Sequence, residues 1–179
     1  MTTLYTHAAF GLGIARLCAA RPKPLLYWGM AALLPILPDF DVFSTAAYGT
    51  PLGHRGLTHS LAFALVVGVL TASATFRYFR TNWWLLAGTL FAIVASHGLL
   101  DALTRGGADI PFFWPLDARY GNWGPIPVAD LAFELPDPRY HRAWRSELLW
   151  VWLPTVLLVG LVTAYRRRNR SARARDSAT

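Results

Sequence analysis

Cysteine and charge are both scarce in this sequence of 179 residues. Its single cysteine, Cys18, excludes an intrachain disulfide, and charged residues make up only 15% of the chain. Hydrophobic residues make up 54%, which is high for a soluble domain. The N-terminus also lacks the charged-then-apolar order and the small-residue cleavage site of a signal peptide. These features predict a single integral membrane domain, and we expect no cleaved leader.

Long uncharged stretches dominate the chain, and their lengths predict helices. The runs 61–79 and 83–103 are long enough to cross a bilayer, and 148–165 is a third candidate span. Two earlier runs, 7–20 and 25–37, each give only about 21 Å of helix, against about 30 Å of hydrocarbon. The sequence therefore predicts an all-α membrane bundle of about five helices, in which the first two cross incompletely or line a cavity.

The charge that is present is unevenly distributed. The net charge is +7, and six arginines between residues 166 and 175 follow the last apolar run. Such a cluster is typical of a cytoplasmic flank that contacts anionic lipid heads. Nucleic-acid binding is not favoured, because the run has no interleaved aromatic residues. We expect one membrane domain over 1–168, with an irregular non-cytoplasmic loop over 104–147, and a disordered basic cytoplasmic tail over 169–179.

This orientation determines where the polar side chains of the membrane domain lie. If the C-terminus is cytoplasmic, successive spans place the 104–147 loop outside, the Arg77–Arg80 turn inside and the His54–Ser60 segment outside. In this orientation the candidate metal ligands, His7, Asp39, His59, His97 and Asp101, all fall at the same, non-cytoplasmic end of the bundle. We therefore expect them to converge.

Three aspartates and two histidines have the spacing of a metal site. His97 and Asp101 are four residues apart and share one helix face, and ionisable groups inside a span are functional candidates by default. Asp39 and Asp41 flank Phe40, so in an extended stretch both would point the same way. His59 opens a helix after a glycine-containing loop, which lets its side chain turn inward. The alternatives are an inert hydrogen bond for His97–Asp101 and a cap or solvated role for one aspartate.

The other three histidines have weaker cases when each is taken alone. His7 would be an ordinary histidine at the start of a helix. His54 could be a ligand, a supporting group or a loop residue. His141 is expected to be exposed. Together, three histidines and two or three carboxylates suit zinc, or another divalent ion such as manganese, with open positions for water. The predicted metal ligands are His7, Asp39, His59, His97 and Asp101, with His54 as a possible addition.

A site of this composition can hydrolyse a phosphoester. A divalent metal generates hydroxide near neutral pH and polarises a phosphoryl or carbonyl oxygen. Asp41 is then the candidate general base, and Arg55 the candidate group that stabilises developing negative charge. Arg105 and Arg119 in the outer loop could also neutralise a phosphate. Snorkelling or loop stabilisation is the alternative role of these arginines.

Several of these segments together resemble the YdjM-like family of inner-membrane-associated metal-dependent hydrolases, also called LexA-binding. The resemblance covers roughly residues 1–165. It implies a multi-pass protein of the bacterial inner membrane, with a metal site and, from the LexA-binding name, a possible protein partner. The matching pieces are His7, Leu37–Asp41, His54–Ser60, His97–Asp101, Thr104 and Phe112–Pro115.

The order of the ligands is also similar, more distantly, to that of the zinc-dependent phospholipase C and P1 nuclease superfamily. There a His, an Asp, a His and a His-x-x-x-Asp occur in this order around a zinc cluster. This resemblance implies that one ion is shared by Asp39, His59, His97 and Asp101, and that Asp101 also contacts a second ion held by His7. The superfamily's later His-x-x-x-His-x-x-x-Glu ligands have no counterpart in the sequence, so a three-metal cluster is not expected.

The predicted function is metal-dependent hydrolysis of a phosphoester in a membrane lipid head group. A lipid could approach such a site laterally, with Phe112–Trp114 covering it at head-group height. A phosphohistidine lipid phosphatase is rejected, because Phe91 stands where that family needs an arginine. The alternative is a non-enzymatic membrane-bound regulator that binds another protein and whose metal is structural.

Overall fold

The computed structural model describes residues 2–19, 21–44, 46, 50–104, 110–116 and 139–176. All the elements it describes are helices, which confirms the predicted all-α class. Two of them, α3 (Leu61–Phe79) and α4 (Trp83–Leu103), have the bounds expected from the sequence. Each begins where a polar side chain caps it, because the side-chain oxygens of Ser60 and Asn82 accept hydrogen bonds from first-turn N–H groups.

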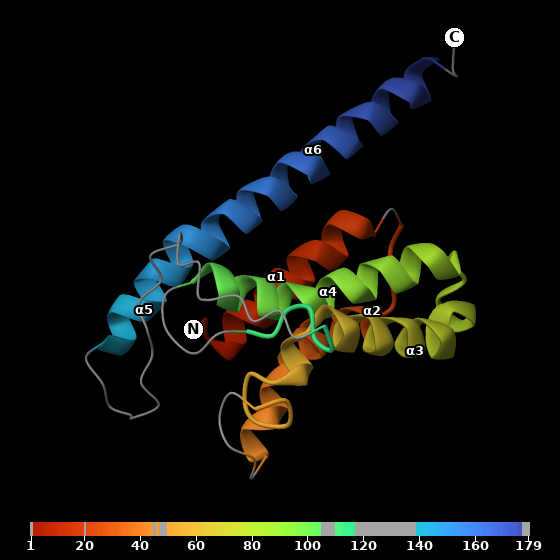
Figure 1. Cartoon of the computed structure of the whole chain (residues 1–179). Coiled ribbons are helices and arrows are strands. Elements are labelled where there is room, and N and C mark those ends of the chain that lie inside the picture. The colour runs from red at the N-terminus through yellow and green to blue at the C-terminus, as the bar shows by residue number, and fades with distance from the viewer. Residues whose placement is uncertain are drawn as a thin grey trace.

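The central helix of the bundle is α4. It packs against α1 (Leu4–Cys18), α3 and the 3₁₀ helix η1 (Leu34–Phe43). Of the most apolar part of α4, 67% is buried, against 17% for α3. Figure 1 shows α1, α2 and α3 gathered around α4, while α6 runs past them and extends beyond the bundle. The outer helices therefore present apolar faces to lipid.

Small residues allow the helices to approach one another closely. A Cβ atom on Gly68 of α3 would lie 2.7 Å from the backbone nitrogen of Phe91 in α4, so any larger residue would push the two helices apart. Contacts of this kind are typical of membrane bundles, where the association of helices depends on close packing. The core beside them is likewise rich in alanine: Ala15, Ala19, Ala31, Ala72 and Ala87.

The second apolar run is longer than predicted. α2 (Leu25–Leu33) continues directly into η1, so the helical run ends at Phe43 and not at Leu37. It is about 33 Å long, enough to cross about 30 Å of hydrocarbon, so the predicted length of about 21 Å is wrong for this run. α1 begins at Leu4, earlier than predicted, yet its 15 residues give only about 22 Å.

One long helical run closes the chain. α5 (Arg139–Glu147), the π-helical turn η3 (Leu148–Trp152) and α6 (Leu153–Asp176) follow one another without a break. The run begins inside the segment predicted as an irregular loop and ends inside the one predicted as a disordered tail. Arginine and alanine are good helix formers, which explains why the apolar helix continues through the basic segment.

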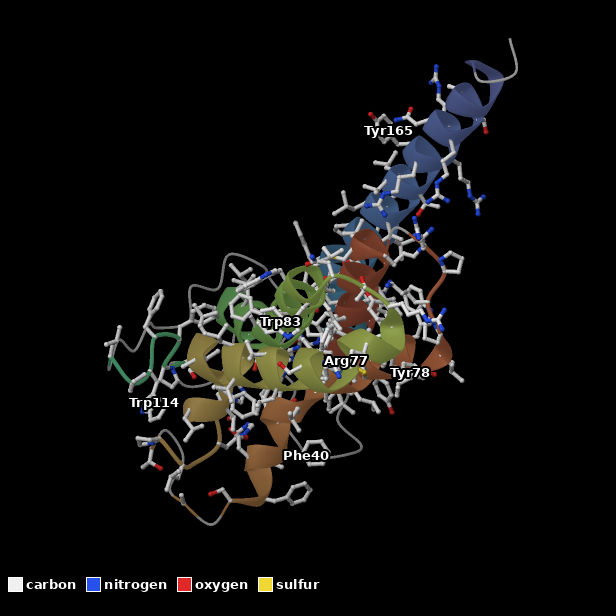
Figure 2. All side chains as sticks on the ribbon, turned by 90° about the vertical axis from the view of Figure 1, so that its right-hand side faces the viewer. Phe40, Arg77, Tyr78, Trp83, Trp114 and Tyr165 are labelled. Carbon is white, nitrogen blue, oxygen red and sulfur yellow. The ribbon has the colours of Figure 1, made fainter. Side chains whose placement is uncertain are left out.

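The helices alternate between two ends of the bundle. One end, here the histidine end, holds His7, His59 and His97. The other, here the arginine end, holds Arg21 and Arg80 around one cavity, and next to it Arg166 donates hydrogen bonds to the carbonyls at the end of α1. Figure 2 shows Trp114 near the first turn of α3 and Arg77 near its last, which marks the two ends.

Glu147 connects the closing helix to the start of α1. Its side chain is fully buried, and its carboxylate accepts hydrogen bonds from the backbone N–H and the hydroxyl of Thr3, both at 2.6 Å. The hydroxyl of Thr6 donates to the same carboxylate and accepts one from the Trp152 indole at 2.7 Å. A carboxylate at a helix N-terminus also interacts favourably with the helix dipole.

Replacing Glu147 should therefore destabilise the protein. Glu147→Ala leaves buried donors of Thr3 and Thr6 unpaired, and we expect the free energy of unfolding in detergent to fall by about 2–3 kcal/mol. The control is Arg145→Ala, on the same helix but exposed, which should change stability by less than about 0.5 kcal/mol. Equal melting temperatures for the two variants would contradict the structural role of Glu147.

Candidate metal centre

The structure brings the five predicted ligands together at the histidine end. They form two groups of three residues, and within each group the candidate ligand atoms lie within 4.8 Å of one another. His97 belongs to both groups. One group is Asp39, His59 and His97, and the other is His7, His97 and Asp101.

The orientation of His97 follows from the two prolines of η1. Its Nδ1 lies 2.7 Å from the carbonyl oxygen of Pro35, and since a carbonyl can only accept, Nδ1 carries the proton. In a 3₁₀ helix that carbonyl would pair with the N–H of residue 38, but Pro38 has none. The prolines therefore leave a free acceptor that fixes the ring, and Nε2 faces the cluster, where the neutral form of the ring presents a lone pair.

His59 is oriented in the same way from the opposite side. Its Nδ1 lies 3.3 Å from Oδ2 of Asp41, an acceptor, so its Nε2 also presents a lone pair. Burial lowers the pKa of His59, which favours the neutral ring. The two Nε2 atoms of His59 and His97 are 3.0 Å apart. When both rings are neutral, these two atoms are acceptors that face each other at hydrogen-bond distance.

Two carboxylate oxygens complete this group of acceptors. Oδ1 of Asp39 lies 3.3 Å from Nε2 of His97 and 3.8 Å from Nε2 of His59, and Oδ2 of Asp101 lies 3.9 Å from Nε2 of His97. Both oxygens are buried, and no described group donates a hydrogen bond to either. The Arg55 guanidinium, 3.7 Å from the Asp101 oxygen, offsets part of this cost, and the remainder is unfavourable in an apolar bundle unless a further cation is bound.

The spacing of three of these acceptors, from Asp39, His59 and His97, fits a tetrahedral zinc site, whereas Asp101 belongs to the second group with His7. Zinc binds imidazole nitrogen and carboxylate oxygen at about 2.0–2.2 Å, which places neighbouring ligand atoms about 3.3–3.5 Å apart. The separations between Asp39, His59 and His97, 3.0 to 3.8 Å, bracket that value. The residues present therefore fit a bound zinc ion, with Asp101 as the fourth candidate ligand.

His7 lies beside this group of four and contacts Asp101. Its Nε2 is 2.7 Å from the hydroxyl of Thr2 and 3.5 Å from Oδ1 of Asp101, and its ring stacks on His97 with centroids 3.9 Å apart. The Thr2 hydroxyl donates to the same aspartate oxygen at 3.1 Å. His7 and Thr2 together hold Asp101 toward His97. Thr2 was not predicted, because an isolated threonine carries no recognisable spacing.

Arg55 reaches the same carboxylate from the loop before α3. Only 1% of its surface is exposed, and its Nη2 lies 3.7 Å from Oδ2 of Asp101. Its backbone has a φ of 61°, in the left-handed region that costs a residue with a Cβ about 1–2 kcal/mol. This conformation turns the guanidinium into the bundle, and strain of this kind is concentrated at functional sites.

Asp41 lies behind His59 and does not face the same way as Asp39. Both aspartates are in the 3₁₀ helix η1, so the extended stretch predicted for them is wrong, and residues two apart point in different directions. Asp41 accepts hydrogen bonds from the backbone N–H of Arg55 at 3.1 Å and from the Thr58 hydroxyl, and His54 Nδ1 lies 2.6 Å away. It thereby joins the loop to η1.

Some predicted residues lie apart from this group. His54 contacts Asp41 and belongs to neither group of ligands. Arg105, Arg119 and the side chain of His141 are outside the described residues. The aromatic segment Phe112–Trp114 lies beside the start of α3, because the carbonyl of Phe112 accepts a hydrogen bond from the backbone N–H of Leu61 at 3.0 Å.

Gly98 is a determinant of the site that we did not single out from the sequence. A Cβ atom there would lie 2.6 Å from the carbonyl oxygen of His59. The missing side chain lets the His59 loop approach α4 one residue after His97, which brings the two imidazoles together. Its position next to a candidate ligand was visible in the sequence, but the close approach of another segment was not.

We expect Gly98→Ala to destabilise the protein although alanine is the better helix former. The added methyl group overpacks the contact with His59, and the cost should be about 1–3 kcal/mol of unfolding free energy. Gly88→Ala is the matched control on the same helix, since nothing lies within 4 Å of a Cβ there, and it should be neutral or stabilising by up to about 1 kcal/mol. The measurement is thermal unfolding in detergent, and equal effects at the two glycines would contradict the close contact.

Comparison with known proteins gives two matches. A family model described as "YdjM inner membrane protein" matches residues 1–169. The inner membrane protein YbcI of Escherichia coli (strain K12) is 42% identical over 180 residues, covering 94% of this chain and all of that protein. No solved structure matches. Neither description states an activity, and the resemblance to the YdjM-like family is confirmed: this chain belongs to the YdjM inner membrane protein family.

Proposed function

We propose that the histidine end binds a zinc ion, and that the protein is a membrane-bound hydrolase of a phosphoester in a lipid head group. The observation that carries the proposal is the convergence of two imidazole Nε2 atoms and a buried carboxylate oxygen of Asp39, within 3.0 to 3.8 Å of one another. Asp39, His59, His97 and Asp101 would hold the ion. When bound, zinc would lower the pKa of a water molecule and polarise a phosphoryl oxygen.

The chain's own residues would keep these ligands in position. Pro35 fixes the ring of His97, and Asp41 fixes that of His59, as hydrogen-bond partners of metal-bound histidines commonly do. His7 and Thr2 hold Asp101. Because the oxygens of Asp41 are engaged by His54, Arg55 and Thr58, its geometry supports a positioning role in place of the general base predicted from the sequence.

Arg55 is the candidate group for binding the phosphate. A buried guanidinium gives charge-assisted, bidentate hydrogen bonds to phosphate oxygens, and these strengthen as negative charge develops in the transition state. Arg55 lies beside Asp101, so one end of the substrate would meet both the arginine and the ion. Its strained backbone is compatible with a conformation retained for function.

A lipid substrate agrees with the location of the site. The site residues of α1 belong to a helix of about 22 Å, shorter than the hydrocarbon, which supports a site below the membrane surface. A head-group phosphate could reach that depth laterally while its acyl chains stay in hydrocarbon. Manganese is the alternative ion, since the same oxygen and imidazole ligands accept it.

A regulator with a structural metal is the second candidate function. One observation favours it: the ligands are enclosed, and of the side chains in the four-residue group Asp39 is the most exposed, at 15%. Structural zinc sites are closed, whereas catalytic ones keep an open position. The LexA-binding name of the resembling family suggests a protein as the partner of such a regulator.

Metal content tests the site itself. We expect about one zinc per chain in the purified protein, measured by inductively coupled plasma mass spectrometry, and a loss of about 10-fold or more in metal affinity in Asp39→Asn and His97→Ala. Cys18→Ser is the control, because it removes a metal-competent side chain that lines the cavity at the opposite end, and it should keep its zinc within about 2-fold. Zinc-free wild-type protein that also binds no added zinc or manganese would contradict the site.

Turnover tests the enzyme. With zinc or manganese, purified protein should hydrolyse a phospholipid or polyprenyl phosphoester, and Asp101→Asn should abolish turnover. Arg55→Gln should lower kcat by about 10²-fold or more while metal content is retained, since it removes a group that stabilises transition-state charge. A fully metallated protein with no turnover across lipid phosphoesters would favour the regulator.

The orientation of the bundle gives a further prediction. The arginine end carries the larger share of the basic residues, including the arginines that follow residue 165, so it should be cytoplasmic and the histidine end non-cytoplasmic. In a Cys18→Ser background, Leu116→Cys, exposed beside the histidine end, should react with an impermeant thiol reagent in intact cells. Ser171→Cys on α6 should react only after the inner face is opened, and the reverse pattern would refute this orientation.

A further inference from the structure

The arginine end contains a cavity that the proposed hydrolysis does not use. Its volume is about 410 Å³, and it lies between the α1–α2 turn and the α3–α4 turn. Arg21 and Lys23 come from the first turn and Arg80 from the second, while Phe79 and Leu86 form part of an apolar wall. No carboxylate is among the described residues that line it.

The three cationic side chains have no carboxylate nearby within residues 2–104. The sequence contains three acidic residues over that range, Asp39, Asp41 and Asp101, and all three lie at the histidine end. Lys23 has a ring contact, with its ammonium 5.6 Å from the centroid of Tyr27. Three positive charges around one cavity repel one another and raise the local concentration of anions.

The lining is amphipathic and continues toward the lipid. Leu85 lines the cavity and is 53% exposed, and the neighbouring Trp84 is exposed as well, so an apolar surface leads from the cavity to the outside of the bundle. Cytoplasmic orientation alone explains why basic residues gather at this end. It does not explain why they surround a cavity that has an apolar wall.

We propose that this cavity binds the phosphate of an anionic phospholipid, with the lipid's acyl chain along Leu85. Arg21, Lys23 and Arg80 supply the charge that recognises the phosphate, and the apolar wall distinguishes a lipid from free inorganic phosphate. The site is at the opposite end from the metal centre, and it does not depend on whether that centre is catalytic.

Native mass spectrometry of the full chain in detergent tests this proposal with phosphatidylglycerol, phosphatidylcholine and inorganic phosphate as probes. We expect phosphatidylglycerol to bind at least about 10-fold more tightly than phosphatidylcholine. The triple variant Arg21→Gln/Lys23→Gln/Arg80→Gln should lose that preference. The control Arg167→Gln/Arg168→Gln/Arg170→Gln removes the same charge from α6, outside the cavity lining, and should keep the affinity within about 2-fold.

A second variant fills the cavity without changing its charge. Leu85→Trp alters an exposed side chain, so folding should be retained, and phosphatidylglycerol affinity should still fall about 10-fold. Equal losses in both arginine variants, or no effect of Leu85→Trp, would overturn the site. Displacement of phosphatidylglycerol by micromolar inorganic phosphate would identify free phosphate as the ligand and overturn the lipid assignment.

Discussion

Burying carboxylates and imidazoles together inside an apolar bundle is the constraint on which the rest of this structure depends. Each such group loses hydration, and each must recover the lost free energy from a donor, an opposite charge or an ion. Asp41 recovers it from Thr58 and the Arg55 backbone, and Glu147 from Thr3 and Thr6. The inward oxygens of Asp39 and Asp101 have no hydrogen-bond donor among the described residues, and they face two imidazole nitrogens. Arg55 is an opposite charge for Asp101, at 3.7 Å, and the proposed divalent cation would compensate Asp39 and the two imidazoles.

The surrounding helices contain features that hold this arrangement. A proline pair in η1 leaves a carbonyl that orients His97, and Gly98 lets the His59 loop approach α4. The backbone of Arg55 is in a left-handed conformation that turns its guanidinium inward. These features all act on one small volume, although they come from three segments far apart in the sequence. The local strain and the loss of helical regularity have a common explanation in the site that they position.

The sequence predicted most of the fold because its signals were local. The two spans α3 and α4 were defined by long apolar runs with polar caps, and their bounds agree with the structure. The candidate ligands were singled out because His97 and Asp101 share a helix face, and because alternating topology predicts the others at the same end, where the structure brings them together. The prediction failed for Asp39 and Asp41, where two prolines favour a 3₁₀ helix over an extended strand. Thr2, Gly98 and Glu147 were missed, because their importance depends on contacts between distant segments that no local spacing records.

The bundle is thus chemically divided, with all the acidic groups of residues 2–104 at the histidine end and a basic cavity at the arginine end. The account depends most on the cation at the histidine end. X-ray absorption at the zinc edge of the purified full chain measures its ligands directly. We predict nitrogen and oxygen ligands at about 2.0–2.2 Å, with outer-shell scattering from two imidazoles that falls to one in His97→Ala. A zinc-loaded protein whose spectrum lacks imidazole scattering, or is unchanged by His97→Ala, would contradict the account.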